Sequence, residues 1–180
     1  MKNKNDVGVW HYQQHKHFDA AIGYFELEMY EESEAELNQI DPSIPTESLA
    51  SVLALKIRIY YGLKNWKSMQ AVARRLVALD PTEPKWKFSD AFATARVESV
   101  QAGKEILERA NEIHPRQAII LYNLASAELH LNNLEAFRQY FEQAFEINSD
   151  WRSFVKEEDI SFEGFVGGLA EGRIRGASNS

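Results

Sequence analysis

Residues 77–84 read VALDPTEP, in which the end of an apolar helical run meets Pro81. A proline lacks the backbone N–H and its ring clashes with the preceding turn, so this stretch marks the end of a helix. Pro42 and Pro115 interrupt the chain in the same way, and Pro81 and Pro115 are 34 residues apart. A fixed period of this length is the sequence signature of a repeat architecture.

The same period governs the residues that can begin a helix. Asn65, Ser99 and Asn133 are 34 residues apart, and each side chain can accept a hydrogen bond from the first turn of a helix. Small or apolar residues follow them in steps of 3, 4 and 3, which predicts one helical face. They are Trp66, Met69, Ala73 and Leu76 in one unit, Val100, Gly103, Leu107 and Ala110 in the next, and Leu134, Phe137, Phe141 and Ala144 in the last. A second helical pattern precedes each turn, so each unit is predicted to be helix, tight turn, helix and stop.

The first unit departs from this regularity. Its turn is predicted at Glu28 and Met29, and its second helix is shorter by about one turn before the stop at Pro42. Terminal repeats are expected to be atypical, because one of their faces has no neighbouring repeat.

Composition narrows the classes of protein. With 180 residues, 44% of them hydrophobic and 12% aromatic, the chain can bury a sizeable core. It contains no cysteine, which excludes disulfides and thiolate metal sites. A net charge of -7 disfavours binding to a phosphate backbone, so we expect no nucleic-acid partner. Because no apolar stretch has the length of a membrane span or signal peptide, we expect no membrane insertion and a cytoplasmic location.

At this point the sequence resembles the tetratricopeptide repeat (TPR) family over residues 14–149. The fourth unit matches the family pattern best, through Leu121, Leu124, Ala125, Phe137, Phe141 and Ala144. The second unit carries Leu53, Tyr60, Trp66, Leu76 and Pro81. Departures are Ile57 where the family has a small residue, and Thr94 and Glu128 where it has tyrosine. The resemblance implies an all-α, right-handed superhelical stack of about four helix-turn-helix repeats, followed by a C-terminal capping helix.

Three segments follow from this interpretation. Residues 1–13 are an N-terminal segment, and residues 14–160 are the TPR-like domain with its cap. Trp151, Phe154 and Val155 are expected to cover the last repeat. Residues 161–180 hold five of the nine glycines and are expected to form a flexible tail.

No residue pattern predicts catalysis. His11, His15 and His17 lie close together, but a further firm ligand and the Glu of a zinc-protease motif are missing, so we expect no metal. The glutamates between residues 26 and 36 are interpreted as a solvated helix face, with a docking surface for a basic partner left as the alternative. Nucleophile-elbow, phosphate-loop and kinase motifs are absent. We therefore expect no enzyme activity and no cofactor.

The resemblance implies a protein-interaction module, either an adaptor or a chaperone-like scaffold, that binds a partner's peptide in the concave groove lined by the first helices. The alternative is a structural or regulatory subunit that packs constitutively against a fixed partner or against itself, so homo-oligomers are possible. The groove residues are predicted to be Phe18, Ile22, Phe25, Arg58, Tyr61, Phe88, Phe92, Arg96, Tyr122, Asn123 and Ser126.

Overall fold

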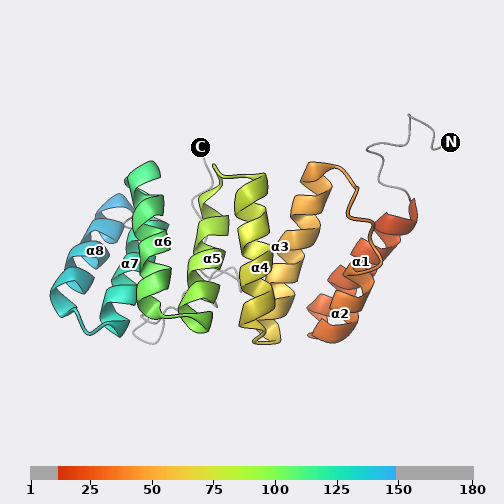
Figure 1. Cartoon of the computed structure of the whole chain (residues 1–180), viewed down its shortest axis with the longest axis horizontal. Helices are drawn as coiled ribbons and strands as arrows, with labels where there is room; N and C mark the ends of the chain where they lie inside the picture. The colour runs from red at the N-terminus through yellow and green to blue at the C-terminus, as the bar shows by residue number, and fades with distance from the viewer. Residues whose placement is uncertain (1–11, 149–180) are drawn as a thin grey trace. The chain divides into compact units, whose positions relative to one another are not determined.

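The computed structural model describes residues 12–148, which form eight α-helices and no strand (Figure 1). The helices are Tyr12–Glu26 (α1), Tyr30–Leu37 (α2), Thr46–Gly62 (α3), Trp66–Leu79 (α4), Pro84–Val97 (α5), Val100–Ile113 (α6), Ala118–His130 (α7) and Leu134–Ile147 (α8). The all-α prediction is confirmed, as is the shortened second helix. The predicted cap around Trp151, the tail at 161–180 and most of the N-terminal segment lie outside the described residues.

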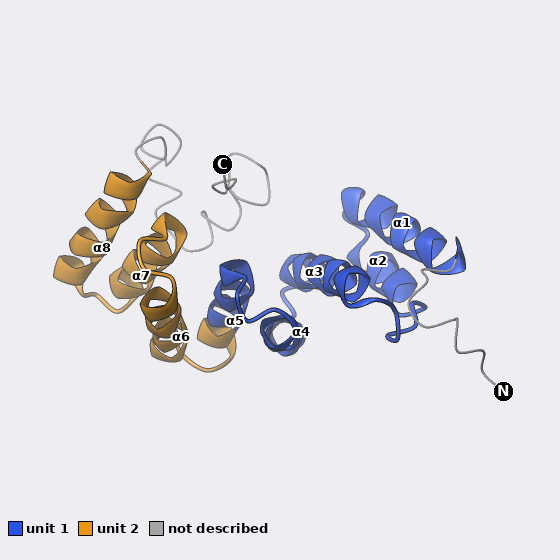
Figure 2. Cartoon of the chain, turned by 90° about the horizontal axis from the view of Figure 1, so that it is seen from above, with its two compact units in different colours: residues 1–93 blue, residues 94–180 orange. Residues whose placement is uncertain are grey.

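The chain divides into two compact units, residues 1–93 and 94–180, with the boundary inside α5 (Figure 2). In the first unit, α1 packs against α2, α3 packs against α4, and α2 and α3 are also in contact. In the second unit, α7 packs against both α6 and α8. The predicted helix pairs α1–α2, α3–α4 and α7–α8 are therefore present, while the pairing of α5 with α6 stays a prediction.

The turns inside three repeats have the same backbone geometry. Glu28, Lys64 and Asn132 each adopt a left-handed conformation, with φ of 59°, 53° and 61°. The next residue in each case donates its N–H to a carbonyl five positions back, at 2.8–2.9 Å. This bond satisfies a carbonyl that the end of the helix would leave without a partner. The same turn therefore joins the helices of the pairs α1–α2, α3–α4 and α7–α8.

Helix starts use the three predicted caps. The side-chain oxygens of Asn65, Ser99 and Asn133 accept hydrogen bonds from the backbone N–H three residues later, at 3.2, 3.1 and 3.4 Å. Such a bond satisfies one of the N–H groups exposed in the first turn. The 34-residue spacing of these caps is therefore a true structural period.

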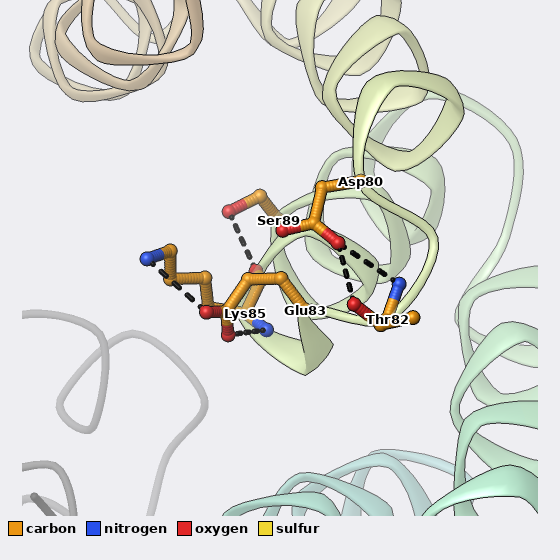
Figure 3. Close-up of polar contacts among 5 residues, drawn as sticks. All are labelled: Asp80, Thr82, Glu83, Lys85 and Ser89. Carbon is orange, nitrogen blue, oxygen red and sulfur yellow. Dashed lines mark hydrogen bonds and ion pairs between the residues drawn. The ribbon is translucent and has the colours of Figure 1, made fainter. Parts of the chain in front are cut away.

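The stop at Asp80 and Pro81 forms a compact corner between α4 and α5 (Figure 3). The Asp80 Oδ1 atom accepts hydrogen bonds from the Thr82 N–H at 3.1 Å and from its hydroxyl at 2.7 Å. These bonds, led by that from the hydroxyl, lower the pKa of Asp80. Further on, the Glu83 carboxylate accepts from the backbone N–H of Lys85 at 3.2 Å, at the start of α5. The stop thus both ends one repeat and begins the next.

The periodic face forms much of the core. Met69, Ala73 and Leu76 are buried on α4, while Gly103, Leu107 and Ala110 are buried on α6. On α8, Ala144 is fully buried. Small residues also lie where α1 and α2 meet. There the buried Ser33 hydroxyl of α2 donates a hydrogen bond to the Ala21 carbonyl of α1 at 2.6 Å. Ile57, which departs from the family pattern, is buried.

Candidate functional site

Three of the predicted groove residues lie together on α1 and α3. The Arg58 guanidinium lies over the Phe25 ring, with its central carbon 4.3 Å from the ring centroid. Phe25 also contacts the Tyr30 ring at 5.7 Å between centroids. One turn before Phe25, Ile22 is 36% exposed. The first unit therefore presents a cation from α3 and an aromatic ring and an aliphatic side chain from α1, which are the first helices of its two helix pairs.

A second aromatic group joins α3, α4 and the first part of α5. The Phe92 ring centroid lies 5.6 Å from that of Tyr61 and 5.4 Å from that of Trp66. Phe92 is 2% exposed, whereas Tyr61 is half-buried. Phe92 therefore serves as core that supports Tyr61, and it is not available to a ligand in this conformation.

The predicted residues of α7 are also buried. Tyr122 belongs to a core cluster with Ala118, Leu121, Ala144 and Phe145. Asn123 and Ser126 are 2% and 4% exposed. The Asn123 amide donates to the Ile119 carbonyl at 2.7 Å, which satisfies it inside its own helix. In this conformation α7 offers none of these three side chains as an open groove surface.

The remaining predicted residues are partly or fully accessible. Phe18 of α1 and Phe88 of α5 are half-buried, and Arg96 near the end of α5 is exposed. Arg58 lies in the first unit and Arg96 in the second. Joint action of these two guanidinium groups therefore stays a prediction.

Other polar groups bind helices to one another. The His17 Nδ1 atom lies 2.6 Å from Glu36 Oε2, which joins α1 to α2. The Tyr60 hydroxyl donates to Glu34 Oε1 at 2.6 Å, which joins α3 to α2. Burial, followed by this bond, raises the pKa of Tyr60. Among residues 12–148 there is no group of three or more side chains placed to hold a metal ion, and no helix there is long and apolar enough to span a membrane.

One polar network was not predicted from the sequence. Lys104 of α6 lies 2.9 Å from the buried carboxylate of Glu128 on α7, and the Asn133 amide donates to the same carboxylate at 3.1 Å. The hydrogen bond that Lys104 donates to Glu128 is the main cause that raises the pKa of Lys104. Glu128 occupies a position where the family pattern has tyrosine, and that departure was the available signal.

The described residues thus have the fold of an all-α, TPR-like helical-repeat protein. No family model matches the sequence, and no curated protein matches it significantly. Solved structures of MamA, a TPR-like helical-repeat protein, are similar. The MamA RS-1 ArsTM double mutant matches with a TM-score of 0.64 and 15% identity, covering 83% of this chain and 79% of that one. MamA AMB-1 matches with a TM-score of 0.57 and 15% identity, covering 89% and 83%. At this identity the likeness shows the fold.

Proposed function

We propose that this chain is a non-catalytic protein-interaction scaffold, and that it binds a peptide segment of a partner along α1 and α3. The residues that we assign to the surface are Phe18, Ile22, Phe25, Arg58 and Tyr61. The TPR-like fold supports the class of function. An adaptor or chaperone-like role, a cytoplasmic location and the lack of a nucleic-acid partner stay predictions within this proposal.

The contact between Arg58 and Phe25 is the observation that carries the proposal. An arginine stacked on an aromatic ring keeps part of its fork of N–H donors available for a carboxylate. Arg58 is exposed, stacks on this ring and forms no ion pair with any residue in the range 12–148. The arrangement therefore orients a cation beside apolar surface without neutralising its charge.

The chemistry of the surface limits the ligand. Ile22 and the half-buried Phe18 offer apolar area to a ligand side chain, while Arg58 offers a partner for a carboxylate. Interfaces obtain most of their affinity from a few anchors of this kind. The expected ligand is a helical or extended peptide with an apolar anchor near an Asp or Glu.

Photo-crosslinking tests this proposal in the native host. A benzoylphenylalanine at position 22 should capture a discrete protein, and Arg58→Glu should suppress that product. The same probe at Glu105, an exposed residue of α6, is the matched control. Equal capture from both positions, or capture that is unaffected by Arg58→Glu, would refute binding at this surface.

The alternative, constitutive packing, has one observation in its favour. Leu27 and Met29 at the α1–α2 turn are 71% and 37% exposed. Such apolar side chains at a turn suit a permanent interface. Light scattering after size exclusion, across a hundredfold range of concentration, would separate the two. A single oligomer at all concentrations that Leu27→Asp dissociates would favour constitutive packing, whereas a monomer throughout would count against self-association.

A further inference from the structure

Charge is segregated within the first unit. Residues 48–79, which form most of α3 and all of α4, contain six Lys or Arg residues and no Asp or Glu. The whole chain, in contrast, carries a net charge of -7. The basic residues are Lys56, Arg58, Lys64, Lys67, Arg74 and Arg75. A stretch of net positive charge therefore lies within a protein that is acidic overall.

Several of these cations lie on one face of α4. Lys67, Ala71, Arg74, Arg75 and Ala78 are all exposed, and their spacing places them along one side of a helix. The outward face of α4 is thus a row of cations separated by two alanines. Small side chains between the cations leave room for another chain to approach the helix closely.

Second helices of other repeats differ at equivalent places. The exposed face of α2 carries Glu31 and Glu32, and the exposed residues of α8 include Glu135, Glu142 and Glu146 beside Arg138. On α6 the exposed residues have both signs of charge. A uniformly basic face is therefore a particular feature of α4 and does not follow from the repeat itself.

Among the cations of this surface, Arg74 is paired, whereas Lys64, Lys67 and Arg75 are not engaged in ion pairs with the described residues. The Arg74 Nε atom lies 3.2 Å from the Oδ1 atom of Asp90, a residue of α5. Burial is the main cause that lowers the pKa of Lys56, and the nearby Arg75 adds to it against the attraction of Glu34. Like charges placed together are stabilised when an anion binds between them.

We propose that the outward face of α4, with Lys67, Arg74 and Arg75, forms together with Lys64 of the preceding turn a second binding surface that takes an acidic segment of a partner protein. This surface differs from the surface on α1 and α3, so an experiment can refute one of the two binding proposals without refuting the other. A short acidic peptide senses charges within about 8 Å at physiological salt. It would therefore respond to the local cations, whereas a longer nucleic acid would also meet the acidic remainder of the chain.

The test uses fluorescein-labelled decaglutamate and fluorescence anisotropy. We expect saturable binding at physiological salt that Lys67→Glu with Arg75→Glu weakens by about tenfold or more. Arg109→Glu with Arg138→Glu makes the same change in net charge at exposed residues of α6 and α8, and should weaken binding by less than about threefold.

Each contrary result overturns the proposal. These are a wild-type protein that does not bind decaglutamate, equal losses in the two double variants, or tighter binding of a ten-nucleotide single-stranded DNA. If the glutamate variant of α4 loses its helical circular dichroism, Lys67→Gln with Arg75→Gln replaces it. That milder variant should weaken binding by about threefold or more, and unchanged affinity would also refute the proposal.

Discussion

A methyl group added at Gly62 should destabilise the protein, whereas one added at Gly23 should stabilise it. A Cβ atom at Gly62, the last residue of α3, would lie 2.5–2.8 Å from three ring atoms of Tyr30 on α2. A Cβ atom at Gly23, inside α1, would meet nothing within 4 Å. The two glycines therefore make a matched pair in which the same chemical change has opposite consequences.

The magnitudes follow from packing and helix propensity. Alanine in place of glycine favours a helix by about 1 kcal/mol in its interior and by less at its end. Overpacking costs about 1–3 kcal/mol, and the Tyr30 ring has limited freedom to move because Phe25 contacts it. We expect Gly62→Ala to lower the free energy of unfolding by about 1–2 kcal/mol, and Gly23→Ala to raise it by about 0.5–1 kcal/mol.

Thermal unfolding followed by circular dichroism at 222 nm measures both. At about 2–4 °C per kcal/mol, the two melting temperatures should move in opposite directions by several degrees. Combining Gly62→Ala with Tyr30→Leu should cost less than the sum of the single changes, since the smaller side chain removes the clash. A Gly62→Ala protein as stable as Gly23→Ala would refute the described contact between α2 and α3.

Three further predictions concern caps, buried charge and pH. Ser99→Ala removes the cap of α6 and should lower the free energy of unfolding by about 1 kcal/mol, measured by urea titration; an unchanged midpoint would contradict the cap. Lys104→Met leaves the buried Glu128 carboxylate without its cation and should cost about 3 kcal/mol in the same assay, whereas a loss below about 0.5 kcal/mol would contradict the buried pair. Since the pKa of Tyr60 is raised in the folded state by burial and by Glu34, its contribution to stability is present below pH 10 and is lost as pH rises above about 10. Tyr60→Phe should therefore reduce the loss of stability between about pH 10 and 11.5, and an identical pH profile would show that Tyr60 does not contribute.

The repeat and its punctuation could be predicted because they depend on local chemistry. Asn65 and Ser99 cap helices through their own side chains, and Pro81 ends a helix through its own ring. Burial of Ala110 follows from its place on a face of period 3.6. None of these inferences requires knowledge of which helices meet.

Accessibility of the groove residues could not be predicted in the same way. Phe92 is buried because Tyr61 and Trp66 pack on it from two other helices. The first helix of the fourth repeat is apolar on several sides, and a helix of that kind is expected to be buried all round. That pattern, in the stretch that contains Tyr122 and Ser126, indicated burial more strongly than an open groove.

The basic face of α4 could be predicted from the sequence only in part. The net charge of the whole chain conceals the reversal of sign between residues 48 and 79. Counting charge over each predicted helix pair would have revealed it. Whether the cations lie on one exposed face, however, depends on the side of α4 that packs against α3, which needs the structure.

Calorimetry with the segment captured by crosslinking at position 22 tests the proposed function most directly. Arg58→Glu should weaken binding by about thirtyfold, corresponding to an anchor of about 2 kcal/mol. Arg109→Glu makes the same charge change on α6 and should leave the dissociation constant within about twofold. Equal affinities of the wild-type, Arg58→Glu and Arg109→Glu proteins, all with unchanged helical circular dichroism, would show that the surface of α1 and α3 does not bind the partner.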